Sequence, residues 1–175
     1  MSEVWHLRKR RQGYVLFTGY AHFSCFVGKS GLIDSRIKEE GDGATPIGCW
    51  KVRGLFYRPD RININQLPAA LPLPIRTLAP HDGWCDDPTS NVYNYPVRLP
   101  FSDNHESLWR DDGIYDLILP LGYNDAPPRA GKGSAIFLHC ADAKTKHTKG
   151  CIALGHDDLL AAIQNVKTSL HINIQ

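Results

Sequence analysis

The sequence predicts a mostly β fold with one or two short helices. Short apolar runs alternate with polar residues and end at turns rich in glycine and proline, which is typical of strands. Only residues 156–166 have the periodicity of an amphipathic helix, and prolines interrupt residues 58–100. At 175 residues the chain is long enough to bury a core, so we expect a single domain, residues 1–175.

The N-terminal elements are predicted in order from these signals. Residues 14–17 and 22–27 alternate and indicate two strands joined by a turn. A glycine-rich loop at 40–48 precedes a third strand at 49–52. Residues 58–100 hold too many prolines for a long helix or a central strand. We expect an ordered surface excursion there, anchored by aromatic residues and forming one wall of a binding groove.

The second half of the chain predicts a further set of elements. They are a helical turn at 105–111, strands at 115–124 and 134–139 around a turn at 126–133, a helix at 156–166 and a last strand at 170–174. The predicted helix carries apolar residues on one face, namely Leu159, Leu160, Ile163 and Val166. Asp157 and Asp158 lie in its first turn, where carboxylates favour the helix dipole.

Composition excludes several classes of protein. The net charge of +2 is spread along the chain, so we expect no nucleic-acid partner and no membrane partner. The basic run at 8–11 fits a solvated strand edge or turn. The sequence GKS at 28–30 is not a nucleotide-binding loop, because Phe23 stands where the first glycine of that motif belongs.

Cysteine use and the N-terminal sequence bear on location. The five cysteines are odd in number and include no CxxC pair, which fits a reducing compartment better than a disulfide framework. No run approaches the ~18–20 apolar residues of a membrane span. The first residues lack the apolar region of a signal peptide. We therefore expect a cytoplasmic protein, or a periplasmic one if a leader has been removed.

The chemistry is predicted between Ile136 and Leu154. A strand-like run ends at His139, and Gly150 and Cys151 open the next apolar run. A thiol has a reference pKa near ~8.5 and needs a base or a positive field to act as a nucleophile. Gly150 lets the backbone approach a substrate closely. We expect Cys151 to be the nucleophile and His139 its base, with a buried structural cysteine as the alternative.

Several motifs in this sequence resemble the YkuD-type L,D-transpeptidase family. His139 followed by Thr148-Lys149-Gly150-Cys151-Ile152 is similar to the catalytic block of that family, although Ala153 replaces the family's common arginine. The loop G-D-G-A-T-P-I-G at 41–48 also resembles a family segment, as does W-C-D-D-P at 84–88 with Tyr93-Asn94. The resemblance extends from about residue 20 to residue 165 and implies a YkuD-like β-sandwich.

The resemblance implies acyl transfer on peptidoglycan stem tetrapeptides. The cysteine would attack the carbonyl of the L-centre of meso-diaminopimelate and release D-Ala. Water would then give an L,D-carboxypeptidase of muropeptide recycling, and an amine would give an L,D-transpeptidase. Backbone N–H groups around Gly150 and Cys151 would receive the oxyanion. The main-chain carbonyl of Cys140 would orient the imidazole.

Candidate substrate contacts follow from this reading. Because the substrate carries carboxylates, basic side chains are expected to face the groove. The basic candidates are Lys149, Arg98, Arg110 and Arg129, and the other candidates are Thr148, Trp84, Tyr93 and Tyr115. The sequence predicts no cofactor and no resident metal.

Two alternatives stay open at this point. A zinc site is one, because His139, Cys140, His147, Cys151 and His156 lie within one short segment. No paired ligand spacing or H-E-x-x-H frame supports it. A peptidoglycan-binding module without catalysis is the other.

Overall fold

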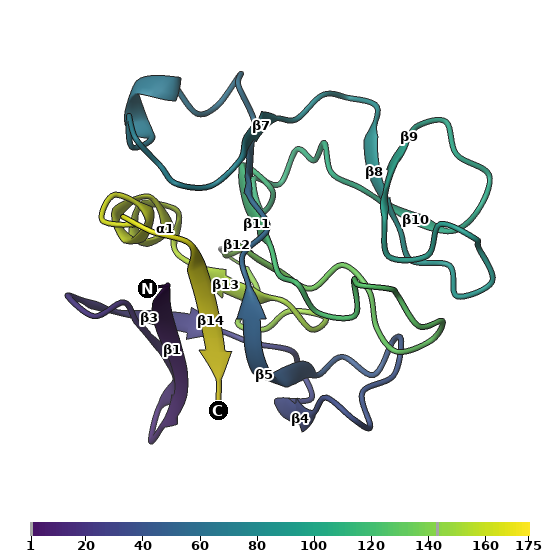
Figure 1. The fold of residues 1–175 in the computed structure, drawn as a ribbon, viewed down its shortest axis with the longest axis horizontal. Helices are drawn as coiled ribbons and strands as arrows, with labels where there is room; N and C mark the ends of the chain where they lie inside the picture. Colours follow the sequence, from purple (N-terminus) through teal and green to yellow (C-terminus); the bar gives the residue numbers. More distant parts are fainter. Residues whose placement is uncertain (1, 143) are drawn as a thin grey trace.

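A strongly curled sheet carries most of the molecule (Figure 1). The computed structural model describes residues 2–142 and 144–175. Within these residues the large sheet has the strand order β4-β5-β14-β1-β2-β3-β13-β12-β11-β6-β7, and β10-β8-β9 form a small second sheet. The one α-helix of the described residues, α1 (His156–Ile163), follows β13.

The bounds of the strands are as follows. The large sheet contains β1 (Glu3–Arg10), β2 (Gly13–Phe17), β3 (His22–Phe26), β4 (Leu32–Asp34), β5 (Thr45–Lys51), β6 (Leu55–Tyr57), β7 (Ile75–Thr77), β11 (Leu117–Pro120), β12 (Phe137–Cys140), β13 (Ile152–Leu154) and β14 (Leu170–Ile174). The small sheet contains β8 (Asp82–Cys85), β9 (Pro96–Arg98) and β10 (His105–Ser107), and a 3-10 turn, η1, spans Ile64–Gln66.

The two halves of the large sheet enclose one hydrophobic core, which gives the β-sandwich. Trp5 and Leu7 of β1 belong to the same buried cluster as Leu119 of β11 and Leu138 of β12. These strands are well separated in the sheet order, so the sheet must fold back on itself. Hydrogen bonds from Arg53 N–H to the Pro120 carbonyl and from Gly122 N–H to the Lys51 carbonyl tie the two halves where β5 leads towards β6.

Most of the predicted elements are confirmed. The runs at 14–17 and 22–27 are β2 and β3, and the last strand spans Leu170–Ile174 as expected. The helix begins at His156 but ends at Ile163, three residues before its predicted end. The mostly β class and the sandwich are confirmed.

Two local predictions differ from the structure. The helical turn predicted at 105–111 is wrong, because His105–Ser107 is strand β10 and pairs with β8. Strand β1 was not predicted, because its second half is the basic run and lacks apolar alternation. Arg8, Lys9 and Arg10 are exposed at the end of this strand, so the expected solvated edge is present.

The proline-rich excursion is ordered and folds into short strands. It contributes β7 to the edge of the large sheet, and β8 and β9 to the small sheet. Pro96 begins β9, an edge strand, where a missing N–H is tolerated. None of the helices in the described residues combines the length and apolarity needed to cross a bilayer.

Candidate active site

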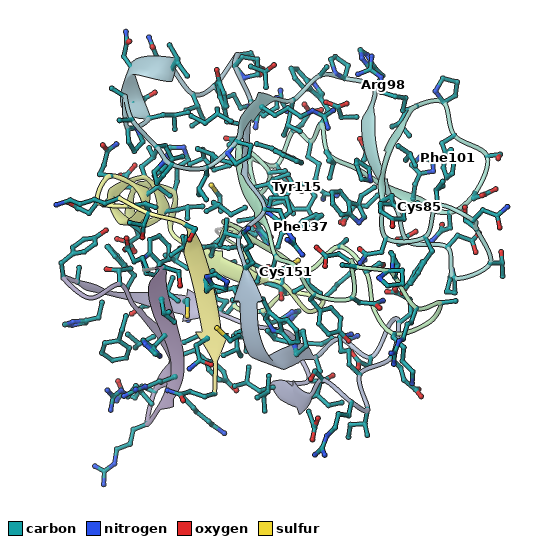
Figure 2. All side chains as sticks on the ribbon, in the orientation of Figure 1. Cys85, Arg98, Phe101, Tyr115, Phe137 and Cys151 are labelled. Carbon is teal, nitrogen blue, oxygen red and sulfur yellow. The ribbon has the colours of Figure 1, made fainter. Side chains whose placement is uncertain are left out.

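Two parallel strands at the middle of the large sheet position the predicted nucleophile and base. β12 pairs with β13 so that Leu138 lies opposite Ile152 and His139 opposite Ala153. Cys151 therefore stands directly before β13, level with Phe137. The Phe137 N–H donates to Cys151 Sγ at 3.3 Å, and the thiol donates to the Ala135 carbonyl at 3.1 Å. Figure 2 shows Tyr115, Phe137 and Cys151 grouped near the centre of the molecule.

The Cys151 thiol is held in its neutral form in this state. Burial raises its pKa to about 12, and the negative charge of Glu106 acts in the same direction. The Phe137 N–H and the Lys38 ammonium lower the pKa by smaller amounts. A carbonyl can only accept, so the contact with Ala135 also requires a proton on sulfur.

His139 is neutral as well, and its hydrogen bond defines the tautomer. Its Nδ1 lies 2.7 Å from the Cys140 carbonyl oxygen, so Nδ1 carries the proton and Nε2 is left as the basic nitrogen. Burial lowers the pKa of His139 to about 4, although main-chain hydrogen bonds with Cys140 and Ile114 act against this. The Tyr115 ring packs edge-on against the imidazole at 5.3 Å between centroids.

One cavity of about 640 Å³ contains both groups in its lining. Thr148, Lys149, Arg110 and Tyr115, four of the expected substrate-contacting residues, also line it. The remaining lining residues include Glu40, Asp86, Asn104, His105, Glu106, Ser107, Asp112, Ser134, Ala135, Ile136 and Ala153. The cavity thus has both cationic and anionic walls beside a buried thiol.

The turn before the nucleophile is fixed by hydrogen bonds and by the absence of a side chain. The Thr148 hydroxyl donates to the Cys151 carbonyl at 2.6 Å and accepts from the Gly150 N–H at 3.1 Å. Gly150 has φ +143°, and a Cβ there would lie 3.1 Å from the Ala44 carbonyl oxygen. Glycine is therefore required by both conformation and contact.

The glycine-rich segment at 40–48, which includes the start of β5 at Thr45, supports this turn. The Thr45 hydroxyl donates to the Cys151 carbonyl at 3.3 Å and accepts from the Gly28 N–H at 2.9 Å. Buried Lys38 pairs with Asp42 of the same loop at 2.6 Å. The loop thus holds both the backbone of the nucleophile and a charge near its sulfur.

Asn94 links the proline-rich excursion to the nucleophile. Its Oδ1 accepts from the Ala135 N–H at 3.0 Å and from Trp84 Nε1 at 2.9 Å, while its Nδ2 donates to the carbonyls of Tyr123 and Asn124. Asn94 and Ala135 both have positive φ, 60° and 50°. The buried amide therefore holds Ala135 in a conformation that aims its carbonyl at the thiol.

Four of the expected substrate-contacting residues, Trp84, Tyr93, Arg98 and Arg129, lie outside the cavity lining. The Trp84 ring packs edge-on against Phe137 at 5.0 Å, and both residues line a separate, smaller pocket. The buried Tyr93 hydroxyl donates to Glu40, and Arg98 lies 3.3 Å from Asp82 in the small sheet. Figure 2 places Arg98 well away from Cys151.

The remaining predicted residues have other partners. Cys140 meets His139 through its main chain and otherwise belongs to the core. Arg129 lies in the lining of a separate surface pocket, where its N–H donates to Asn124.

Sequence reasoning missed Glu106 and Lys38, which both act on the thiol. Each is a single charged residue in a segment without a motif, so no local pattern marked it. Asn94 stood in a quoted motif, but only the fold reveals its contact with Ala135.

The residues considered for a zinc site do not converge. Across residues 2–142 and 144–175 no three His, Cys, Asp or Glu side chains come together as metal ligands would. His147 is exposed on the connecting loop, and His156 begins α1 next to Asp157.

Comparison with known families gives one match. The profile of YkuD, described as an L,D-transpeptidase catalytic domain, matches residues 5–174. No curated protein matches the chain. The matched segment includes the strands, the turn and the loop that surround Cys151 and His139. The chain therefore belongs to the YkuD family of L,D-transpeptidase catalytic domains, enzymes that act on peptidoglycan.

Proposed function

We propose that this protein is a cysteine acyltransferase acting on peptidoglycan stem tetrapeptides. Cys151 attacks the carbonyl of the L-centre of meso-diaminopimelate, and the terminal D-Ala leaves. The observation that carries the proposal is that a buried thiol and a neutral imidazole, whose Nδ1 is occupied by the Cys140 carbonyl, line the same cavity.

The resting protonation states favour proton transfer during attack rather than a preformed ion pair. With a thiol pKa near 12 and an imidazole pKa near 4, both groups are uncharged at neutral pH. The thiol proton moves to His139 Nε2 as sulfur bonds to the carbonyl carbon. His139 then gives this proton to the departing amine of D-Ala, which leaves a thioester on Cys151.

The turn at residues 148–151 supplies the candidate oxyanion donor. The Gly150 N–H already donates to the Thr148 hydroxyl, so it is engaged within the turn. We assign the role to the N–H of Cys151, which lies directly before β13 and lines the cavity. Lys149 and Arg110, also in the lining, would face the carboxylates of the substrate.

The acceptor that resolves the thioester is either water or an amine. Water gives an L,D-carboxypeptidase that trims muropeptides, which suits a cytoplasmic enzyme. An amine gives an L,D-transpeptidase, which suits a periplasmic one. In both cases His139 takes a proton from the acceptor and returns it to sulfur, so the same residues serve the two reactions.

The test is mass spectrometry of a disaccharide-tetrapeptide ending in meso-diaminopimelate–D-Ala. Wild-type protein is expected to remove one D-Ala, and Cys151→Ala to leave the substrate intact. A free tripeptide identifies water as the acceptor, and a cross-linked dimer identifies an amine. Equal D-Ala release by both proteins would overturn the assignment of Cys151, and no release by either would overturn the proposed substrate.

A further inference from the structure

Five carboxylates line the catalytic cavity, and four of them have defined hydrogen-bond donors. Glu40 accepts from Tyr93 and Ser134, Asp86 from Asn104, Asp112 from Arg110, and Asp142 from Thr145. These contacts explain why the four side chains stand where they do.

Glu106 is the exception. It lies on β10 opposite Trp84 and is partly buried in the cavity wall. Among residues 2–142 and 144–175 it forms no ion pair. Burial has the largest effect on its pKa and raises it, while Tyr115 and the charges of Arg110 and Lys149 lower it by smaller amounts. A carboxylate removed from water without a cation is costly unless a ligand completes the pair.

The nearest basic side chains do not complete this pair. Arg110 is committed to Asp112, with 2.5 Å between its Nη2 and the carboxylate. Lys149 is exposed and, within the described residues, forms no ion pair with Glu106, although its charge stabilises the Glu106 carboxylate. The lining that holds Cys151 therefore contains an acidic group, Glu106, and a basic group, Lys149, that are not paired with each other.

We infer that Glu106 binds an ammonium group on the side chain of the substrate's reacting residue. This inference rests on the proposed function, because the D-centre of meso-diaminopimelate carries an ammonium and a carboxylate on one carbon. Glu106 meets the ammonium, and Lys149 meets the carboxylate. A buried carboxylate paired with an ammonium is a strong and selective contact.

Binding at Glu106 also acts on the nucleophile. The negative charge of Glu106 disfavours the Cys151 thiolate, and an ammonium bound to Glu106 offsets that charge. A substrate that carries the ammonium thus makes sulfur easier to ionise in the complex than in the free enzyme. Glu106 therefore selects the substrate and restrains the thiol until that substrate is present.

The first test uses four tetrapeptides that differ only at the third residue. Meso-diaminopimelate carries both groups, lysine only the ammonium, 2-aminopimelate only the carboxylate, and norleucine neither. We expect wild type to release D-Ala from the lysine peptide with kcat/KM about tenfold above that for norleucine. Glu106→Gln is expected to reduce this ratio to near one, and the control Asp86→Asn to preserve it. An unchanged ratio in Glu106→Gln would overturn the inference.

A second test needs no turnover. Modification of Cys151 by 2-aminoethyl and by methyl methanethiosulfonate is followed by mass spectrometry of the Cys151 peptide. Wild type and Asp86→Asn are expected to favour the cationic reagent, and Glu106→Gln to lose that preference while its rate with the neutral reagent rises. If no peptide is turned over, the proposed function fails. The ratio of the modification rates with the cationic and the neutral reagent still decides the inference. Equal ratios in wild type and Glu106→Gln would contradict it.

Discussion

At the scale of single residues, burial keeps both the nucleophile Cys151 and the base His139 uncharged in the free enzyme. Burial drives both pKa values away from neutrality, upwards for Cys151 and downwards for His139. The sequence predicted Cys151 and His139 because His139 ends one strand-like run and Cys151 follows Gly150 at the start of the next. It could not reveal Ala135, since alanine carries no signal for the positive φ that turns its carbonyl towards sulfur.

Because the imidazole of His139 is buried, the stability of the protein decreases at acidic pH. The unfolded state binds a proton near the ordinary pKa of 6.5, whereas folded His139 does so only near 4. Its contribution is therefore present above pH 6.5 and is lost as pH falls towards 4. We expect wild type to lose about 2 kcal/mol of unfolding free energy between pH 8 and pH 5 through this residue. In urea titrations, the unfolding free energy of His139→Gln should decrease less than that of wild type between pH 8 and pH 5. The exposed control His147→Gln should show the same decrease as wild type.

Asn94 offers a test of how the thiol is held. Asn94→Gly accommodates the positive φ but leaves the Ala135 N–H and Trp84 Nε1 without their acceptor, which should cost about 1–3 kcal/mol. With the Ala135 carbonyl released, iodoacetamide should modify Cys151 faster at pH 8. Asn124→Gly is the matched control, because Asn124 also has positive φ and holds a neighbouring loop. Equal labelling rates in the two variants would show that Asn94 has no influence on the thiol.

At the scale of elements, the sheet was easier to predict than the pieces attached to it. Alternation marked β2, β3 and β14, where one face is buried and the other is open. The segment H-E-S-L-W-R-D suggested a helical turn, yet pairing with β8 makes it strand β10. Tertiary pairing overrode local propensity there, and this is why Glu106 was not recognised as part of the site.

The turn at residues 148–151 should tolerate no side chain at its glycine. Gly150→Ala must adopt φ +143° and place a Cβ 3.1 Å from the Ala44 oxygen and 3.3 Å from Ile136 Cδ1. A loss of at least about 2 kcal/mol is expected in thermal or urea unfolding, together with reduced labelling of Cys151. Gly41→Ala, with φ +76° and open space around it, should lose only about 1 kcal/mol and keep its labelling. Similar effects in both variants would mean that contact with Ala44 is unimportant.

At the scale of the whole molecule, three buried thiols make the stability of the protein decrease at alkaline pH. Cys25, Cys140 and Cys151 each have a pKa raised by burial from 9.0 to about 12. The folded state keeps protons that the unfolded state loses, so their contribution is present below pH 9 and is lost as pH rises towards 12.

This alkaline dependence can be assigned to individual residues. Each of these three thiols should remove about 1 kcal/mol of unfolding free energy by pH 10. Comparing pH 8 with pH 10, Cys25→Ala should show a smaller decrease than wild type. Cys49→Ala, which changes an exposed thiol, should match wild type. If the unfolding free energy of Cys25→Ala decreased as much as that of wild type, the buried-thiol explanation would be contradicted.

The parallel pairing of β1 with β14 has a consequence for synthesis. Glu3 lies opposite Leu170 and Leu7 opposite Ile174, and β14 separates β1 from β5 within the sheet. Residues 170–174 are synthesised after both β1 and β5, so these two strands keep an unpaired edge until β14 has left the ribosome. The large sheet is therefore continuous from β4 to β7 only after β14 has been inserted between β1 and β5.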